Sequence, residues 1–340
     1  MKWSVGIDLG GTNIQADLVN VRMELVDRVH AKTLAPRSAR SLAGSLADSV
    51  RRLLDRQGIQ ASQLEAIGIG LPGMVDSRTG KLLYAANLGL EEVDFPSLMA
   101  DYFPQTPVLT GNDADCAVLA ECMVGGAQGY DSALLLTLGT GLGGGFVYQG
   151  RIFRGGDGWG IEPGHMVLVA REGWPCSCGQ EGCFEAYVSI RGLKRLVQEV
   201  LDQDGPSLLR DWMQPEGASF NARLVFDAVE EGDSLALDVL ESYVHYLALG
   251  IRSLVVLYRP EIILLGGGIS RAGDLLCLPL EAAVRQTSFA GDLLCLPLEA
   301  AVRQTSFAGD LLAPPPIRTS RLGNEAGILG AGVLYLNEDS

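Results

Sequence analysis

The sequence is short of positive charge. It has 26 lysines and arginines against 41 aspartates and glutamates, a net charge of −15 at pH 7. A chain of this sign repels phosphate backbones and anionic lipids, which excludes nucleic acid and membrane surfaces as its main partners. A phosphate ligand would therefore be held by backbone N–H groups, a few local charges and Mg²⁺.

The sequence also lacks a long apolar run. No uninterrupted stretch reaches the roughly 18 residues of a membrane span, and the apolar stretch 247–258 is interrupted by Arg252. Asp8 interrupts the first apolar stretch, so no secretory signal is recognised and we expect a cytoplasmic protein. Proline is scarce, with 15 residues, and hydrophobic residues make up 47 %, which excludes collagen-like and low-complexity chains.

Glycine, in contrast, is abundant. The chain has 43 glycines among 340 residues, where average usage of about 7 % would give about 24. In a folded protein such an excess marks tight turns and places where the backbone approaches a ligand closely. The length itself predicts two domains, each with its own core.

The apolar pattern predicts an α/β fold, because expected strands and helices alternate along the chain. Strands are expected at 3–9, 14–19, 24–30, 66–71, 133–138, 145–149 and 261–265. Helices are expected at 41–57 and 114–124, through most of 185–258, and at 324–336.

Two glycine clusters each lie between two expected strands. The first cluster contains Asp8, Gly10, Gly11, Thr12 and Asn13, and the second spans 139–145. The second contains a formal G-x-G-x-x-G, but the residues after it continue as a strand rather than a helix, which excludes a dinucleotide fingerprint. Such hairpins suit phosphates, with Asp8 near a Mg²⁺ water, although ordinary hairpin turns use the same residues.

Three further segments offer polar or bare backbone groups. Glycines 266–268 follow a strand, where adenine or ribose could lie close, or where the chain simply turns. Glu162 and His165, three residues apart, could point into one cavity or lie on a surface turn. Asn112 and Asp113 stand at a helix start, where they could be caps or could include a base for a hydroxyl proton.

One histidine and three cysteines have the spacing of a metal site. His165 is followed by Cys176, Cys178 and Cys183 in a C-x-C-x4-C pattern. One nitrogen and three sulfurs form a closed tetrahedral set that is typical of structural zinc. Such a metal would shape the loop 165–183 rather than catalyse, and would aim Glu185 just beyond it.

A tandem duplication stands apart from these motifs. Residues 272–289 recur unchanged as residues 290–307. Proline at 279 and 297 and the Ala290-Gly291-Asp292 junction predict two short successive helices. The duplication is either a slippage event without new function or an apolar arm that alters contacts between subunits.

Taken together, the motifs resemble the ROK family (repressor, open reading frame, kinase), which includes sugar kinases. The resemblance runs along nearly the whole chain, and the E-x-G-H followed by C-x-C-G-x-x-G-C-x-E is its most specific part. Its elements are DLGGT at 8–12, LPG at 71–73, NDAD at 112–115, GTGLGGG at 139–145, EPGH at 162–165, CSCGQEGC at 176–183, GGG at 266–268 and LGNEAGILGA at 322–331.

The resemblance implies an actin-like, ribonuclease H-like pair of α/β domains with a cleft between them. A smaller domain would comprise 1–111 and 322–340, and a larger one 112–321 with the zinc loop and the duplication. It further implies a cytoplasmic homodimer or homotetramer whose ligands are a sugar and ATP.

The implied activity is ATP- and Mg²⁺-dependent phosphorylation of the 6-hydroxyl of a hexose, with glucose as the first expectation. Asp113 would be the general base. The sugar would be held by Gly73, Asn87, Asn112, Asp113, Glu162, His165 and Glu185. The phosphates would face Asp8, Gly10, Gly11, Thr12, Asn13, Thr140 and Gly141, and the adenosine would face Gly267 and Gly268.

Two alternatives remain open, another sugar substrate and a protein without catalysis, whereas a repressor is not expected. N-acetylglucosamine, N-acetylmannosamine or another hexose could be the substrate, because these sugar contacts are shared across the family. The family's repressors carry an additional N-terminal helix-turn-helix domain, for which the position of Asp8 leaves no room. The protein could also be a sugar sensor or an inactive duplicate.

Overall fold

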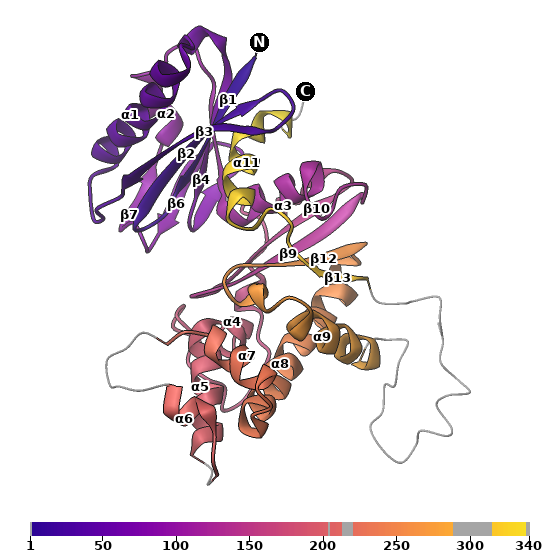
Figure 1. The fold of residues 1–340 in the computed structure, drawn as a ribbon. Coiled ribbons are helices and arrows are strands. Elements are labelled where there is room, and N and C mark those ends of the chain that lie inside the picture. Colours follow the sequence, from indigo (N-terminus) through magenta and orange to yellow (C-terminus); the bar gives the residue numbers. More distant parts are fainter. Residues whose placement is uncertain (1, 203–204, 213–219, 288–314, 338–340) are drawn as a thin grey trace. The chain divides into compact units, whose positions relative to one another are not determined.

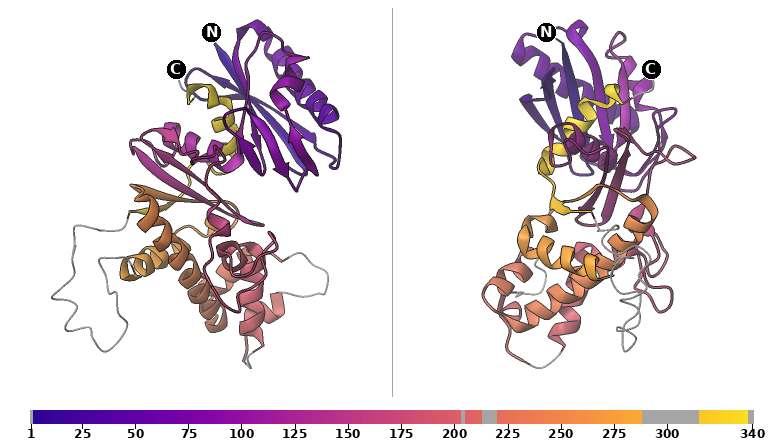
Figure 2. Two further views of the ribbon diagram at one scale, coloured as in Figure 1. Left: turned by 180° about the vertical axis from the view of Figure 1, so that it is seen from behind. Right: turned by 90° about the vertical axis from the view of Figure 1, so that its right-hand side faces the viewer.

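A computed structural model describes residues 2–202, 205–212, 220–287 and 315–337 (Figures 1 and 2). The chain forms two compact units. Unit 1 comprises Met1–Leu135, Gly145–Ile161 and Arg321–Ser340, and unit 2 comprises Leu136–Gly144 and Glu162–Ser320. Each unit is described by itself.

Unit 1 is built on a five-stranded sheet in the order β3-β2-β1-β4-β8. Strands β1, β2 and β3 pair antiparallel, whereas β1, β4 and β8 pair parallel. The strands are β1 (Trp3–Leu9), β2 (Asn13–Asn20), β3 (Leu25–Lys32), β4 (Leu64–Leu71) and β8 (Val108–Asn112). A three-stranded sheet contains β5 (Met74–Asp76), β6 (Lys81–Ala85) and β7 (Leu90–Val93).

Helix α1 (Ala39–Gln57) covers one face of the larger sheet together with α2 (Phe95–Ala100) (Figure 1). The α1 residues that face the sheet recur every three or four positions, as in Leu42, Leu46 and Val50. Ser38 caps the first turn, and Gly58 ends the helix in the left-handed conformation with φ 63°. A 3₁₀ turn, η1 (Ala61–Gln63), leads into β4.

The opposite face of this sheet packs against α11 (Ala326–Gly332), which lies across the strands in the right-hand view of Figure 2. Strand side chains alternate between the two faces, so Ile7 faces α1 while Gly6 faces α11. A Cβ at Gly68 of β4 would lie 1.6 Å from the Ala331 carbonyl oxygen. The glycines of β1 and β4 therefore let the α11 backbone rest directly on the sheet.

Helix α3 (Asp113–Val124) packs against α11 in the same way. A Cβ at Gly330 would lie 1.6 Å from the Cys116 carbonyl oxygen. At its other end, the buried carboxylate of Glu121 accepts hydrogen bonds from the backbone N–H of Gly126, Arg321 and Leu322 at 2.6, 3.1 and 2.7 Å. These contacts connect α3 to the chain segment that leads into α11.

The second five-stranded sheet has the order β11-β10-β9-β12-β13, and the division between the units falls within β9 and β10. Its strands are β9 (Ser132–Leu138), β10 (Leu142–Tyr148), β11 (Arg151–Ile152), β12 (Ile262–Gly266) and β13 (Ile317–Thr319). Unit 2 is otherwise mainly helical. Among its described residues, the helices are α4 (Phe184–Val188), α5 (Ile190–Leu201), α6 (Leu208–Trp212), α7 (Arg223–Glu230), α8 (Ser234–Tyr258) and α9 (Asp274–Thr287). The described part of the chain also contains the 3₁₀ turns η2 (Pro163–His165), η3 (Ile269–Ala272), η5 (Gly323–Glu325) and η6 (Leu334–Leu336).

Helix α8 is central to unit 2. Within the described part of the chain it is the one helix long and apolar enough to cross a membrane, but 56 % of its apolar window is buried in the structure. It packs against α4, α5, α7 and α9. Its apolar residues therefore serve the core of unit 2.

The expected strands and helices are present, two of them with changed bounds, and the structure adds α2, β5, β6, β7, β11 and β13. Strand β10 begins at Leu142, so only 139–141 form the turn of the second glycine cluster. The last α-helix ends at Gly332, and the expected helix 324–336 consists of a 3₁₀ turn, α11 and a second 3₁₀ turn. The first copy of the duplication forms one helix with Pro279 inside it, and the second copy lies outside the described residues.

Replacing Gly330 by alanine tests the close contact of α11 with α3. Alanine favours a helix over glycine by about 1 kcal/mol, but the added Cβ would collide with the Cys116 carbonyl, an overpacking that costs about 2–3 kcal/mol. We expect Gly330→Ala to lower the melting temperature by about 5 °C. Gly156→Ala, where a Cβ meets no atom within 4 Å, is the matched control. Equal melting temperatures for the two variants would contradict this packing.

Candidate functional site

The first glycine hairpin lies in unit 1, between β1 and β2. The Gly10 N–H donates to the Asn13 carbonyl at 2.9 Å, and the Thr33 hydroxyl donates to the Gly10 carbonyl at 2.6 Å. A Cβ at Gly11 would lie 3.0 Å from the Asn87 carbonyl oxygen. The structure thus places Asn87, predicted to bind sugar, against a glycine predicted to face phosphate.

Asp8 lies at the end of β1, beside this hairpin. Burial raises the pKa of its carboxyl, and the negative charge of Asp17 raises it further. Asp17 is fully buried and accepts two hydrogen bonds from the Arg28 guanidinium at 2.7–3.0 Å. A divalent cation near Asp8 would oppose both effects and favour the ionised carboxylate.

The start of α3 holds the predicted base and its neighbour. Asn112 is the N-cap, and its side-chain oxygen accepts from the N–H of Ala114 and Asp115 at 2.8 and 3.2 Å. Its side-chain amide donates to the Gly73 carbonyl at 3.0 Å, which joins two predicted sugar-binding residues. Asp113 is the first residue of the helix and accepts from Ala114 N–H at 2.8 Å.

Asp113 is exposed and lies in the first turn of α3. Beneath it, burial raises the pKa of the Cys116 thiol well above its usual value, and the charges of Asp115, Asp113 and Asp8 add to this effect. The carboxylates of Asp8 and Asp113 therefore lie around the same buried thiol. Unit 1 gathers the predicted base and the predicted Mg²⁺ ligand in one region.

The second glycine hairpin, at 139–141, lies in unit 2. The Gly139 N–H donates to the Gly141 carbonyl at 3.0 Å, and Thr140 at the tip is exposed. The next N–H, that of Leu142, donates to the Glu185 carboxylate at 3.0 Å. A Cβ at Gly141 would lie 2.5 Å from the same carboxylate oxygen, so only glycine fits there without movement of Glu185.

Glu185 connects this hairpin to the cysteine loop. Its side chain is in the first turn of α4, which begins directly after Cys183. The other carboxylate oxygen accepts from the Ser177 hydroxyl and lies 3.7 Å from the Cys176 sulfur. The residue is only 7 % exposed, so these contacts hold its carboxylate in one orientation.

Glu162 and His165 lie at the two ends of the 3₁₀ turn η2, near Glu185. Burial raises the pKa of the Glu162 carboxyl, the His165 side chain lowers it and the Glu185 carboxylate raises it. These mutual effects show that unit 2 brings together the three predicted sugar-binding residues it contains.

The four predicted metal ligands form a compact cluster, with their ligand atoms all within 4.8 Å of one another. The Cys176 sulfur lies 3.7 Å from the His165 Nδ1 atom, and the Cys178 and Cys183 sulfurs are also 3.7 Å apart. In a tetrahedral zinc site with Zn–S bonds of about 2.3 Å, neighbouring sulfurs are about 3.8 Å apart. The donor atoms and their spacing therefore fit a tetrahedral metal ion.

The third glycine cluster, after β12, borders a cavity of about 600 Å³. Gly268 lines this cavity, as do Arg271 of η3 and the segment from Phe220 to Arg223 before and at the start of α7. Sequence reasoning predicted Gly268 here but missed Asn221 and Arg223, since these residues carry no motif and lie more than forty positions away. The cavity has the size of a small-molecule site, and its lining contains polar and charged side chains.

Unit 1 thus contains Asp8, the first hairpin, Gly73, Asn87, Asn112 and Asp113. Unit 2 contains the second hairpin, Glu162, His165, Glu185, the metal cluster, Gly267 and Gly268. The sequence analysis also missed Ser177, which donates a hydrogen bond to Glu185. Its position between Cys176 and Cys178 was a signal that it belongs to the cysteine loop.

The sheet order of unit 1, its parallel strands β1, β4 and β8 and the glycine hairpin in each unit agree with the structural neighbours and define a protein with the actin-like ATPase fold. The sequence matches the ROK family over residues 4–338. The chain belongs to the ROK family, as its motifs predicted.

Three similar proteins illustrate the match. A glucokinase of Halalkalibacterium halodurans is 31 % identical over 339 residues, covering 100 % of this chain and 96 % of its own. A glucokinase of Thermotoga maritima is 34 % identical, covering 82 % and 86 %. The structure of a ROK family glucokinase from Streptomyces griseus, in complex with glucose and AMPPNP, matches with a TM-score of 0.73 and 27 % identity, covering 98 % of each chain.

The geometry of the metal cluster predicts about one zinc ion per chain. In Cys183→Ser we expect the zinc that survives dialysis against a chelator to fall more than about ten-fold. Mutation of a residue that only orients a metal ligand already lowers metal affinity about 10–100-fold, and removal of a ligand should lower it at least as much. Cys122→Ser removes a part-buried cysteine of α3 outside the cluster and should leave the zinc unchanged. Elemental analysis of the dialysed proteins gives the measurement, and full retention of zinc by Cys183→Ser would be evidence against the site.

Proposed function

We propose that this protein is an ATP-dependent hexose kinase that phosphorylates the 6-hydroxyl of glucose. One observation carries the proposal: in each unit a glycine of a phosphate-type hairpin lies against a residue predicted to bind sugar. In unit 1 the pair is Gly11 and Asn87, and in unit 2 it is Gly141 and Glu185. A phosphotransferase needs this arrangement, because the hydroxyl acceptor and the phosphoryl donor must be held side by side.

Asp113 accepts the proton of the 6-hydroxyl as the oxygen attacks the γ-phosphorus of ATP. Two features prepare it for this role. The Ala114 N–H donates to one carboxylate oxygen of Asp113, and the Asn112 cap fixes the start of α3. Since phosphoryl transfer depends mainly on positioning and charge stabilisation, a single carboxylate is sufficient base chemistry.

The family resemblance assigns sugar contacts to residues of each unit. In unit 1 these are Asn87, Asn112 and the backbone of Gly73, and in unit 2 they are Glu162, His165 and Glu185. Glu185 has a second task, since its bond to Leu142 N–H aligns the hairpin whose amides would face phosphate oxygens. Binding of the sugar at Glu185 is therefore coupled to the conformation of the phosphate hairpin.

ATP would place its phosphates at the Gly10–Asn13 and Thr140–Gly141 hairpins and its nucleoside in the cavity beside Gly268. Mg²⁺ would neutralise phosphate charge, and Asp8 is the carboxylate placed to hold it or one of its waters. Zinc in the His165–Cys183 cluster would be structural, because all four positions are taken by protein ligands. It would brace the loop that orients Ser177 and Glu185.

The same family resemblance supports a cytoplasmic homodimer or homotetramer. It also supports a smaller domain of 1–111 and 322–340 and a larger one of 112–321. We include both in the proposal. A sugar sensor without catalysis is the competing function, and ADP production in the presence of glucose separates the two.

Asp113→Ala removes the proposed base while leaving the Asn112 cap in place. Loss of a general base costs about 10²–10⁴-fold in rate, so we expect turnover to fall at least about 100-fold with glucose binding kept. Steady-state kinetics and calorimetric titration with glucose give the two measurements. Asp115→Asn, two positions along α3, should remain near wild type. An Asp113→Ala variant with near-normal turnover would refute the assignment.

A panel of glucose, N-acetylglucosamine, N-acetylmannosamine, fructose and allose tests the substrate. We expect kcat/KM with ATP to be highest for glucose. A higher value for either N-acetylhexosamine would transfer the proposal to an N-acetylhexosamine kinase without changing the role of Asp113. No ADP formation with any sugar would instead favour the sensor.

A further inference from the structure

Helix α9 is the first of two identical copies of the same sequence. It runs from Asp274 to Thr287 within the copy 272–289, and the copy 290–307 follows it directly. The residues that continue the chain are also alike, because 290–294 and 308–312 both read AGDLL. Each copy therefore contains the whole sequence of α9 and is followed by the same five residues.

The packing of α9 depends on a small set of side chains. Leu276, Leu280 and Val284 are fully buried, and Cys277 is 5 % exposed. They recur along one face and pack α9 against α8. The second copy has the same residues eighteen positions later, with Leu294, Cys295, Leu298 and Val302.

Both ends of α9 are also specified within the copy. At the start, Gly273 adopts φ 59°, and its N–H donates to the Ser270 carbonyl at 3.0 Å. The second copy has Gly291 here, preceded at the same spacing by Ser288. Towards the end, the Glu281 carboxylate accepts from Ile317 N–H of β13 at 2.8 Å, a contact that Glu299 would reproduce.

We propose that either copy can form α9, so that the protein has two folded states with the same packing in this part of unit 2. In the first state the surplus copy lengthens the connection from α9 to β13. In the second it lengthens the connection from β12 to α9. Because the cost of closing a loop grows only with the logarithm of its length, this difference changes the ratio of the two states by only about two-fold.

The exchange would change the surroundings of one cavity. Arg271, Ala272 and Leu275 line the cavity of about 600 Å³ beside Gly268. In the second state the surplus copy would enter the chain directly after Arg271, at the wall of this cavity. Its effect on nucleotide binding rests on the proposed function, whereas the exchange itself can be tested without any activity.

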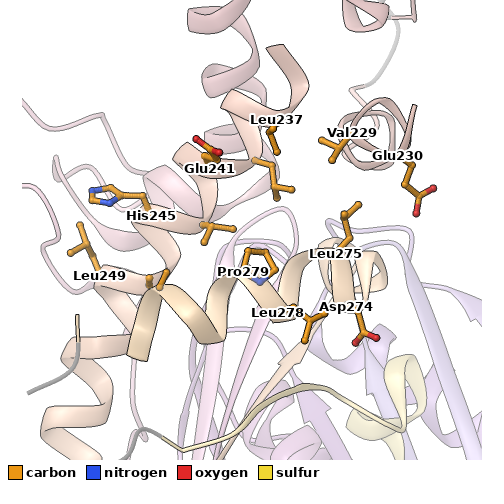
Figure 3. Close-up of a pocket in the computed structure, with 14 residues that line it drawn as sticks. Val229, Glu230, Leu237, Glu241, His245, Leu249, Asp274, Leu275, Leu278 and Pro279 are labelled. Carbon is orange, nitrogen blue, oxygen red and sulfur yellow. The ribbon is translucent and has the colours of Figure 1, made fainter. Parts of the chain in front are cut away.

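A second apolar surface offers a competing place for the surplus copy. Between α7, α8 and α9 lies a groove of about 770 Å³, bordered by Leu237, His245, Leu275 and Pro279 (Figure 3). If the surplus copy were docked there beside α9, both copies would be needed for stability. The exchange predicts instead that either copy can be lost.

The test places a charge in the buried position of one copy at a time. We expect Leu276→Asp and Leu294→Asp each to change the melting temperature of the full chain by less than about 3 °C, because the intact copy forms α9. The double variant should melt at least about 10 °C below the unsubstituted chain. The same loss is expected when Leu276→Asp is placed in a chain that lacks 290–307, because no intact copy remains. Leu278→Asp, at a position that is 61 % exposed, is the control in both chains.

Thiol labelling identifies the copy that is folded. Trypsin cleavage after Arg271, Arg285 and Arg303 places Cys277 and Cys295 in different peptides, so mass spectrometry reads each separately. We expect Cys277 to be the slowly labelled thiol in Leu294→Asp and Cys295 to be the slow one in Leu276→Asp.

Two results would overturn the exchange. One is that Leu276→Asp lowers the melting temperature of the full chain as much as that of the shortened chain. The other is that Leu294→Asp alone destabilises the full chain, which would favour docking in the groove. Loss of kinase activity in every variant, wild type included, would overturn the proposed function and not the exchange.

Discussion

Close backbone packing at glycine holds unit 1 together and determines where its chemistry lies. A side chain at Gly68 would reach the carbonyl of Ala331, and one at Gly330 would reach the carbonyl of Cys116, each at 1.6 Å. Because these side chains are absent, α11 rests on the sheet and on α3 at once. The start of α3 carries Asn112 and Asp113, so the position of the proposed base depends on contacts between backbones.

The same close approach recurs at the two hairpins that we propose bind phosphate. Gly11 lies against Asn87 and Gly141 lies against Glu185. Phosphate oxygens bind to backbone N–H groups only where no side chain blocks the approach. Some glycines of the chain thus let elements pack closely, and in our proposal the hairpin glycines also leave the backbone of a turn open to phosphate.

Carboxylates supply the second kind of restraint. Glu121 connects α3 to the segment before α11, and Glu185 connects the second hairpin to the cysteine loop. Each is buried, and each accepts hydrogen bonds from N–H or O–H groups of separate segments. A buried carboxylate without such partners would be costly, so these residues specify one arrangement of the segments they join. The Glu185 side chain thus both joins two segments and makes the proposed contact with the sugar.

Much of this protein could be predicted from local sequence pattern. Alternation and three-to-four-residue spacing predicted β1 and α1, and the strand after Gly145 excluded a dinucleotide fingerprint. The spacing of Cys176, Cys178 and Cys183 predicted the cluster with His165. The pattern did not reveal that Pro279 lies inside a helix, since that depends on how α9 packs against α8.

The sequence by itself therefore determined the elements, the family and the chemical type of each site residue, because these depend on near neighbours in the chain. Only the tertiary structure decided which distant residues meet. It brought Leu142 to Glu185, Gly11 to Asn87, and Arg223 to the cavity beside Gly268. Such contacts follow from the packing of whole elements, and no residue's neighbours in the sequence carry that information.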